Sequence, residues 1–139
     1  MSYILALIIF SAIVIFHELG HFLLAKWNGI EVIEFSLGMG PRLLSHVWGD
    51  TRYSLKLLPI GGSCQMVGEE EASDSEGAFG NKSVWARMAV IFAGPFFNFV
   101  FALILAFIMI GISGADLPDI ARVEKKSPAQ EAGLKAGDQ

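Results

Sequence analysis

The stretch FHELGHF, residues 16–22, places two histidines and a glutamate at a spacing that can bind a metal ion. In a helix, His17 and His21 are four positions apart and project from the same face, where two imidazole nitrogens can share one zinc ion. Glu18 is turned by about 100° around the helix axis, so it need not be a ligand. It can take a proton from a water that the metal acidifies. This H-E-x-x-H pattern therefore predicts two metal ligands and a general base on one helical turn.

The sequence around this motif is apolar enough to lie in a membrane. Residues 3–25 are uncharged apart from the motif, and residues 88–112 carry no charge at all. Each segment exceeds the about 20 apolar residues that cross a bilayer. A pair of helix histidines bonded only to their neighbours is the alternative to a metal site. Because ionisable groups at membrane depth are costly and usually functional, we favour the metal.

Composition agrees with a membrane protein and narrows the classes of partner. The chain is 53% hydrophobic and only 17% charged, whereas soluble domains carry about a quarter charged residues. The net charge is −4 and there is no long basic run, so no nucleic-acid partner is expected. The single cysteine, Cys64, excludes an internal disulfide framework and a multi-cysteine zinc cluster.

The flanking charges predict how the segments are oriented. A cleaved signal peptide, the alternative for the first segment, needs a basic start and a small-residue cleavage site, but no Lys or Arg precedes Lys26. Trp27 and Trp85 stand where interfacial aromatic anchors are expected. By the positive-inside rule the connecting region is cytoplasmic, and the N-terminus and tail lie outside. The basic residues of that region are Lys26, Arg42, Arg52, Lys56, Lys82 and Arg87.

The region between the two segments is expected to form a short sheet of three or four strands. VIEFSLGMGPRLLS, residues 32–45, has the pattern of a hairpin that turns at residues 38–41. TRYSLKLLPIGG, residues 51–62, alternates in polarity and is expected to end as a strand at Pro59, Gly61 and Gly62. The acidic stretch at residues 68–83 is interpreted as a solvated loop rather than a cation site.

A third metal ligand is not evident. A catalytic zinc normally has three protein ligands and a water. The candidates in this chain lie in the connecting region or at the outer end of the second segment, and none is convincing. They are Glu34, His46, Asp50, Cys64 and Asp116.

Several motifs together resemble one family. HELGH is followed in order by FSLGMGPRLL, YSLKLLPIGGSCQMVGE, AGPFFNFVFALIL and SPAQEAGLKAGD. The chain resembles the N-terminal part of the bacterial site-2 proteases, intramembrane zinc metalloproteases with an extracytoplasmic PDZ domain. The resemblance implies a polytopic α-helical membrane protein. Its parts would be a first transmembrane helix (1–25), a cytoplasmic-side β region with a re-entrant β-loop and acidic loop (26–83), a second transmembrane helix (84–113) and the start of a PDZ domain (114–139).

The resemblance also implies residue roles. His17 and His21 would bind Zn²⁺, and Glu18 would be the catalytic acid/base. The family's third ligand is an aspartate in a Leu-Asp-Gly motif on a later helix, which does not occur before Gln139. GPFFN, residues 94–98, resembles the family's G-x-x-x-N element, so Asn98 is expected to bind substrate. The alternative for Asn98 is an amide that joins helices.

PIGGSCQM, residues 59–66, resembles the family's membrane-re-entrant β-loop. Gly61 and Gly62 would permit its turn, and its strand edge could hold an unwound substrate by strand addition. A plain cytoplasmic hairpin is the alternative. In the tail, residues 121–124 are expected to be a strand, and Ser127 to cap a very short helix that Gly133 ends.

The function expected from these features is hydrolysis of peptide bonds in or near transmembrane segments of membrane proteins. The partners would be the lipid bilayer and a single-span substrate, or one already cut once, in the bacterial inner membrane. With two of three ligands, the chain alone should bind metal weakly and be inactive. A membrane scaffold or metal transporter using the same histidines is the alternative function. A membrane protease with a cytosolic catalytic domain would want its motif on an amphipathic helix, which this helix is not.

Overall fold

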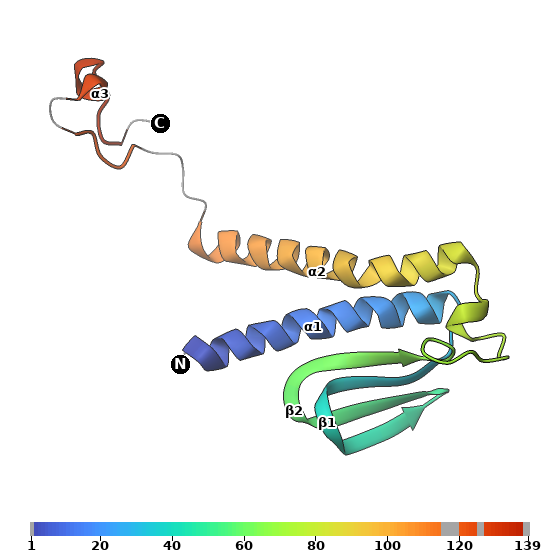
Figure 1. The fold of residues 1–139 in the computed structure, drawn as a ribbon. Coiled ribbons are helices and arrows are strands. Elements are labelled where there is room, and N and C mark those ends of the chain that lie inside the picture. The colour runs from blue at the N-terminus through green and yellow to red at the C-terminus, as the bar shows by residue number, and fades with distance from the viewer. Residues whose placement is uncertain (1, 115–119, 125–126, 138–139) are drawn as a thin grey trace. The chain divides into compact units, whose positions relative to one another are not determined.

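The computed structural model describes residues 2–114, 120–124 and 127–137. Two long helices, α1 (Ser2–Trp27) and α2 (Val84–Ser113), enclose in sequence the strands β1 (Val32–Trp48) and β2 (Thr51–Met66) (Figure 1). A 3₁₀ turn, Phe79–Asn81, precedes α2, and the short helix α3, Pro128–Glu131, lies in the tail. The chain divides into two compact units, Met1–Leu103 and Ile104–Gln139.

Within the first unit, α1 and the part of α2 up to Leu103 run side by side in opposite directions (Figure 1). The rings of Phe16 and Phe101 stack with centroids 4.0 Å apart. One turn further along α1, a Cβ added to Gly20 would lie 2.5 Å from the carbonyl oxygen of Ala93. The helices therefore approach closely only because residue 20 has no side chain, and this approach sets the motif of α1 opposite the first half of α2.

Both helices are long and apolar enough to cross a membrane, as the sequence predicts. A core helix of a soluble protein would pass the same test but would be buried. In the most apolar 18-residue segment of the first helix 11% of the residues are buried, and in the corresponding segment of the second helix none is buried. Large apolar side chains such as Phe10, Phe92 and Phe99 are exposed, which fits helices that face lipid.

The sheet consists of two long antiparallel strands, so the prediction of three or four short strands is wrong in number. Both strands bend back, and the first half of β1 has partners on both of its sides. Leu37, for example, is paired with Gly62 along one edge and with Leu55 along the other. Because of these bends, the two strands form a sheet that is locally more than two strands wide, which explains why the sequence suggested three or four strands.

Two turn predictions are also wrong. Residues 38–41 and residues 59–62 were expected to be a hairpin turn and a strand end, but both lie inside continuous strands. The connection between β1 and β2 lies at Gly49 and Asp50 instead. Gly38 and Gly61 have φ of 85° and 75°, a left-handed conformation that glycine adopts at little cost. These glycines allow the strands to bend without ending.

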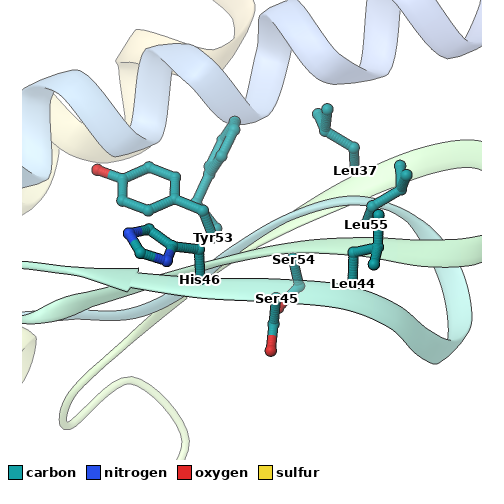
Figure 2. A pocket seen from close by; sticks show the side chains of 8 residues that line it. Leu37, Leu44, Ser45, His46, Tyr53, Ser54 and Leu55 are labelled. Atoms are coloured by element: carbon teal, nitrogen blue, oxygen red, sulfur yellow. The ribbon is translucent and has the colours of Figure 1, made fainter.

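The face of the sheet toward α1 is apolar. Phe22 of α1 packs against Phe35 and Tyr53, with ring centroids 5.0 and 5.9 Å away. Figure 2 shows Leu37 and Leu55 on the same side, lining an apolar groove of about 440 Å³. Next to it lies the buried core that joins helices and sheet. It contains Ala25, Ile30, Val32, Cys64, Met66 and Val90.

A buried carboxylate holds the bent strands together. Glu34 is 4% exposed and accepts hydrogen bonds from Arg42 at 2.7 and 3.2 Å and from the Ser54 hydroxyl at 2.6 Å. The ammonium of Lys56 lies 3.7 Å away. The hydrogen bonds from Arg42, more than any other contact, lower the pKa of Glu34 from its ordinary 4.5 to about 2. The carboxylate thus stays charged and links β1 on both sides of its bend to β2.

The tail contains the short helix that the sequence predicts. The Ser127 hydroxyl caps α3 by accepting from the Gln130 N–H at 3.3 Å, and Gly133 follows with φ of 86°. The strand expected at residues 121–124 is not present. A strand needs a neighbouring strand to pair with, and the described parts of the tail, residues 120–124 and 127–137, contain none. A hydrogen bond from the Gly137 N–H to the Ile120 carbonyl connects these two parts.

We predict that Glu34→Gln lowers the free energy of unfolding by about 1–3 kcal/mol, because a buried charged acceptor is lost. The folded-state pKa lies below the ordinary value, so this stabilisation is complete above about pH 4.5 and is lost as pH falls toward 2. Thermal unfolding of the detergent-solubilised protein between neutral pH and about pH 3 should show a larger decrease in Tm for wild type than for the variant. Glu70→Gln, in the exposed loop, is the control. Equal behaviour of the two variants would contradict the role of Glu34.

Candidate metal centre

The three motif residues lie on α1 where α2 passes closest. The imidazole rings of His17 and His21 are 4.8 Å apart between centroids and inclined by 80°. Helix α2 faces them with Val90, Gly94 and Asn98. These three are four residues apart along α2 and therefore share one face of that helix.

The tautomer of His21 is set by the backbone of α2. Its Nδ1 lies 2.7 Å from the carbonyl oxygen of Val90. A carbonyl can only accept, so Nδ1 carries the proton and Nε2 keeps its lone pair. Metal-binding histidines commonly have such an arrangement, with one nitrogen donating to a carbonyl or carboxylate. His21 is therefore prepared to bind a metal through Nε2.

The Nε2 atoms of both histidines converge on Gly94. A Cβ added to this glycine would lie 2.5 Å from Nε2 of His21 and 2.6 Å from Nε2 of His17. The two rings can lie this close to α2 only because residue 94 has no side chain. Their Nε2 atoms are therefore near one another on one side of α2, as two nitrogen ligands of one zinc ion must be.

No third protein ligand joins the histidines within the described parts of the chain, since no group of three His, Cys, Asp or Glu residues there could hold a metal ion. Glu34 is engaged by Arg42, and His46 lines the apolar groove on the sheet. Asp116 lies outside the described residues.

Strand β2 holds the Glu18 carboxylate. The backbone N–H of Cys64 donates to Oε2 of Glu18 at 3.0 Å. Among the described residues no hydrogen bond to the other oxygen, Oε1, is present, so Oε1 is available to a water. From the sequence, Cys64 was considered only for its thiol, as an unconvincing metal ligand. No sequence signal could have shown its role, because every residue except proline carries this N–H.

The glycines of β2 lie beside the motif. A Cβ on Gly62 would be 3.7 Å from Cγ of Glu18, and one on Gly61 would be 3.7 Å from Cγ1 of Val14. The Ser11 hydroxyl donates to the carbonyl of Pro59 at 3.0 Å. Residues 59–64 thus run along α1 from Ser11 to Glu18, so Gly61 and Gly62 lie beside the motif helix.

Asn98 lies beside the motif. Its side-chain amide is 3.1 Å from Nδ1 of His17. Its sequence pattern predicts a contact with substrate, and in the structure the amide contacts a motif histidine.

A small cavity opens beside the motif. It has a volume of about 180 Å³, and Glu69 lines it together with Glu18 and His21. Sequence reasoning interpreted residues 68–83 as a solvated loop, and Glu69 is indeed exposed. It also accepts from the Met66 N–H at 3.2 Å, which anchors this carboxylate next to the site. The larger groove on the sheet contains none of the motif residues.

We predict that Gly94→Ala abolishes metal binding. The added methyl group would occupy the space that both Nε2 atoms face. The loss of affinity should exceed the about 10–100-fold that removal of an outer contact costs. Chelator competition with the purified protein measures it. Gly111→Ala, also in α2 but with nothing within 4 Å of the new Cβ, is the control and should bind like wild type. Unchanged affinity of Gly94→Ala would place the metal elsewhere.

Comparison with known proteins gives consistent results. A profile of Peptidase family M50 matches residues 5–135. A protein of Clostridium acetobutylicum named "Putative zinc metalloprotease" is 45% identical over 136 residues, which are 97% of this chain and 40% of that protein. Proteins with the same kind of name in Clostridium perfringens and Fusobacterium nucleatum are 45% and 40% identical, covering 100% and 99% of this chain and 42% and 38% of theirs.

The chain spans about two fifths of the length of these relatives. The zinc expected from the sequence is the metal in their names. The family match covers both long helices, the sheet between them and the convergent histidines. The chain therefore belongs to peptidase family M50, the site-2 protease family that its motifs resemble.

Proposed function

We propose that the full-length protein is an intramembrane zinc metalloprotease, which hydrolyses peptide bonds in or near transmembrane segments of membrane proteins. The observation that carries this proposal is the convergence of the Nε2 atoms of His17 and His21 on Gly94, with Glu18 alongside. This arrangement lies on a helix long and apolar enough to cross a membrane.

In this proposal, His17 and His21 hold zinc through Nε2, and the family's aspartate on a later helix completes the site. Zinc, when bound there, would polarise the scissile carbonyl and acidify a water. Glu18 accepts a proton from the attacking water at Oε1 and returns it to the leaving amine. The Cys64 N–H, bonded to Oε2, holds the carboxylate in orientation during both transfers. The chain alone, with two ligands, should bind zinc weakly and not cleave.

Strand β2 is the proposed substrate platform. Its residues 62–66 pair with β1 along one edge, and the N–H of Cys64 points from this stretch to Glu18. A substrate helix hides its peptide bonds and must open before hydrolysis. An opened segment that adds to the strand at Gly61 and Gly62 would lie directly beside Glu18. The amide of Asn98, across the site on α2, would contribute a hydrogen bond to the substrate.

The bent half of the sheet is proposed to enter the bilayer. It lies alongside α1 near Ser11, as the hydrogen bond to Pro59 indicates, and its large apolar side chains are exposed. These are Met39, Leu43, Leu44, Leu55, Leu57 and Leu58. Irregular backbone at this depth is tolerated where protein satisfies it, as the Ser11 hydroxyl does here.

The proposed location is the bacterial inner membrane. Trp27 and Trp85, both exposed, stand at the end of α1 and the start of α2 and would mark the cytoplasmic interface. The N-terminus and the tail, which we propose begins a PDZ domain, would be extracytoplasmic. Substrates would be single-span membrane proteins, or ones already cut once.

We predict that Glu18→Gln retains zinc but loses at least about 10²-fold in cleavage rate, the lower range for loss of a general acid/base. Bound zinc and cleavage of a single-span substrate are measured with the full-length protein in proteoliposomes. Glu71→Gln, in the exposed loop, is the control and should cleave like wild type.

Cleavage by Glu18→Gln at the wild-type rate would exclude the motif as the active site. Zinc in both proteins with cleavage by neither would favour a scaffold or transport function.

A further inference from the structure

We propose that Asn98 is a positioning residue of the metal centre, whose amide oxygen accepts a hydrogen bond from Nδ1–H of His17 and thereby directs Nε2 of that ring to the metal. This inference rests on the proposed function, because it assumes that His17 is a ligand. It gives Asn98 a role on the metal ligand in addition to any contact with substrate.

The geometry decides which amide atom faces the ring. As placed in the structure, the amide nitrogen Nδ2 of Asn98 lies 3.1 Å from Nδ1 of His17. In that orientation Nδ1 has to accept, and the proton of a neutral imidazole sits on Nε2. That proton would point into the space beside Gly94 and block the ligating lone pair. The amide oxygen Oδ1 would also be buried without a hydrogen-bond partner among the described residues.

The opposite amide orientation removes the conflict at the metal-facing nitrogen. The oxygen and nitrogen of an asparagine amide are assigned from their hydrogen-bond partners. With Oδ1 toward His17, the ring donates from Nδ1 and keeps its Nε2 lone pair for the metal. The amide NH₂ then takes the other position, which is buried and has no hydrogen-bond partner among the described residues. A substrate carbonyl that reached this position would satisfy the NH₂, so both roles of Asn98 are compatible with one orientation.

His17 and His21 take the partners of their Nδ1 atoms from one face of α2. The Val90 carbonyl is the partner of His21. Gly94 lets both rings lie against α2, and Asn98, one turn later on the same face, supplies the acceptor for His17. The spacing of Gly94 and Asn98 therefore matches the spacing of the two histidines on α1.

The rival role for Asn98 is an amide that joins helices or contacts only substrate. Such an amide would leave zinc affinity and the His17 tautomer unchanged when replaced. Asn98→Asp separates the roles, because a carboxylate accepts from Nδ1–H but cannot donate to a substrate carbonyl. Asn98→Leu removes both functions. Asn28→Leu removes an amide bonded to the Leu24 carbonyl, outside the metal centre, and is the control.

The experiment uses the full-length protein in detergent. Chelator competition measures the zinc Kd, and ¹⁵N spectra of histidine-labelled, metal-free protein at about pH 8, above the ordinary imidazole pKa, report the proton position on His17. Asn98→Leu should weaken zinc binding by about 10–100-fold, the usual effect of losing an outer contact, and shift the His17 proton toward Nε2. Asn98→Asp should keep both the affinity and the Nδ1–H form, while losing cleavage. Asn28→Leu should match wild type.

Zinc affinity and tautomer unchanged in Asn98→Leu would overturn the inference, as would equal loss of zinc affinity in Asn98→Asp and Asn98→Leu. Should Asn98→Leu fail to fold, Asn98→Ala replaces it with the same expectation. The proposed function is tested separately by Glu18→Gln. If Glu18→Gln cleaved like wild type while the Asn98 variants behaved as expected, the protein would have a metal site that is not the proteolytic site. If Glu18→Gln lost cleavage but Asn98→Leu left zinc affinity and the His17 tautomer unchanged, the protein would be a protease in which Asn98 does not orient His17.

Discussion

The close approach of α1 and α2 is the constraint on which the rest of the structure depends. It is possible because Gly20 meets the backbone of Ala93 and because Gly94 has no side chain where the histidines converge. In lipid, helices gain little from hydrophobic association, and small residues that permit tight packing hold them together. Here Gly94 also allows the rings of His17 and His21 to lie against α2. Packing and chemistry therefore depend on the same contact.

The second constraint is the cost of ionisable groups at membrane depth. Each polar group of the motif has a partner from another element: His21 has the Val90 carbonyl, His17 the Asn98 amide and Glu18 the N–H of Cys64. Two of these partners come from α2 and one from β2. The motif is thus satisfied only when both elements are in place against α1, which links assembly of the site to folding of this unit.

The sheet contributes through its curvature. Phe35 and Cys64 are paired across the two strands, and this part of the sheet packs on Phe22 and donates to Glu18, while the bent remainder continues along α1 to Ser11. Glycines with positive φ allow the bends, and the buried Glu34 carboxylate ties the bent segments together through Arg42 and Ser54. A buried ion pair thus helps to hold the strand whose Cys64 N–H bonds to Glu18.

The sequence by itself determined the family, the two long apolar helices and the roles expected of His17, Glu18 and His21. Those features depend on local periodicity and on side-chain chemistry, which can be read along the chain. It also indicated Asn98, Gly61 and Gly62, although only as implied by resemblance. The number of strands and the positions of the turns were predicted wrongly from the sequence. Glycine and proline occur in turns, at strand ends and at bends inside strands, so their presence does not distinguish these three cases. Only the tertiary structure decided which.

The contacts that prepare the site were also beyond the sequence. The Val90 carbonyl and the Cys64 N–H belong to the backbone and leave no trace in residue type. The space at Gly94 exists only relative to a second helix more than seventy positions away from the motif. The sequence determined which groups can react, whereas their directions and partners were decided by the packing of α1, α2 and β2, because hydrogen bonds between distant segments depend on how the backbones meet in space.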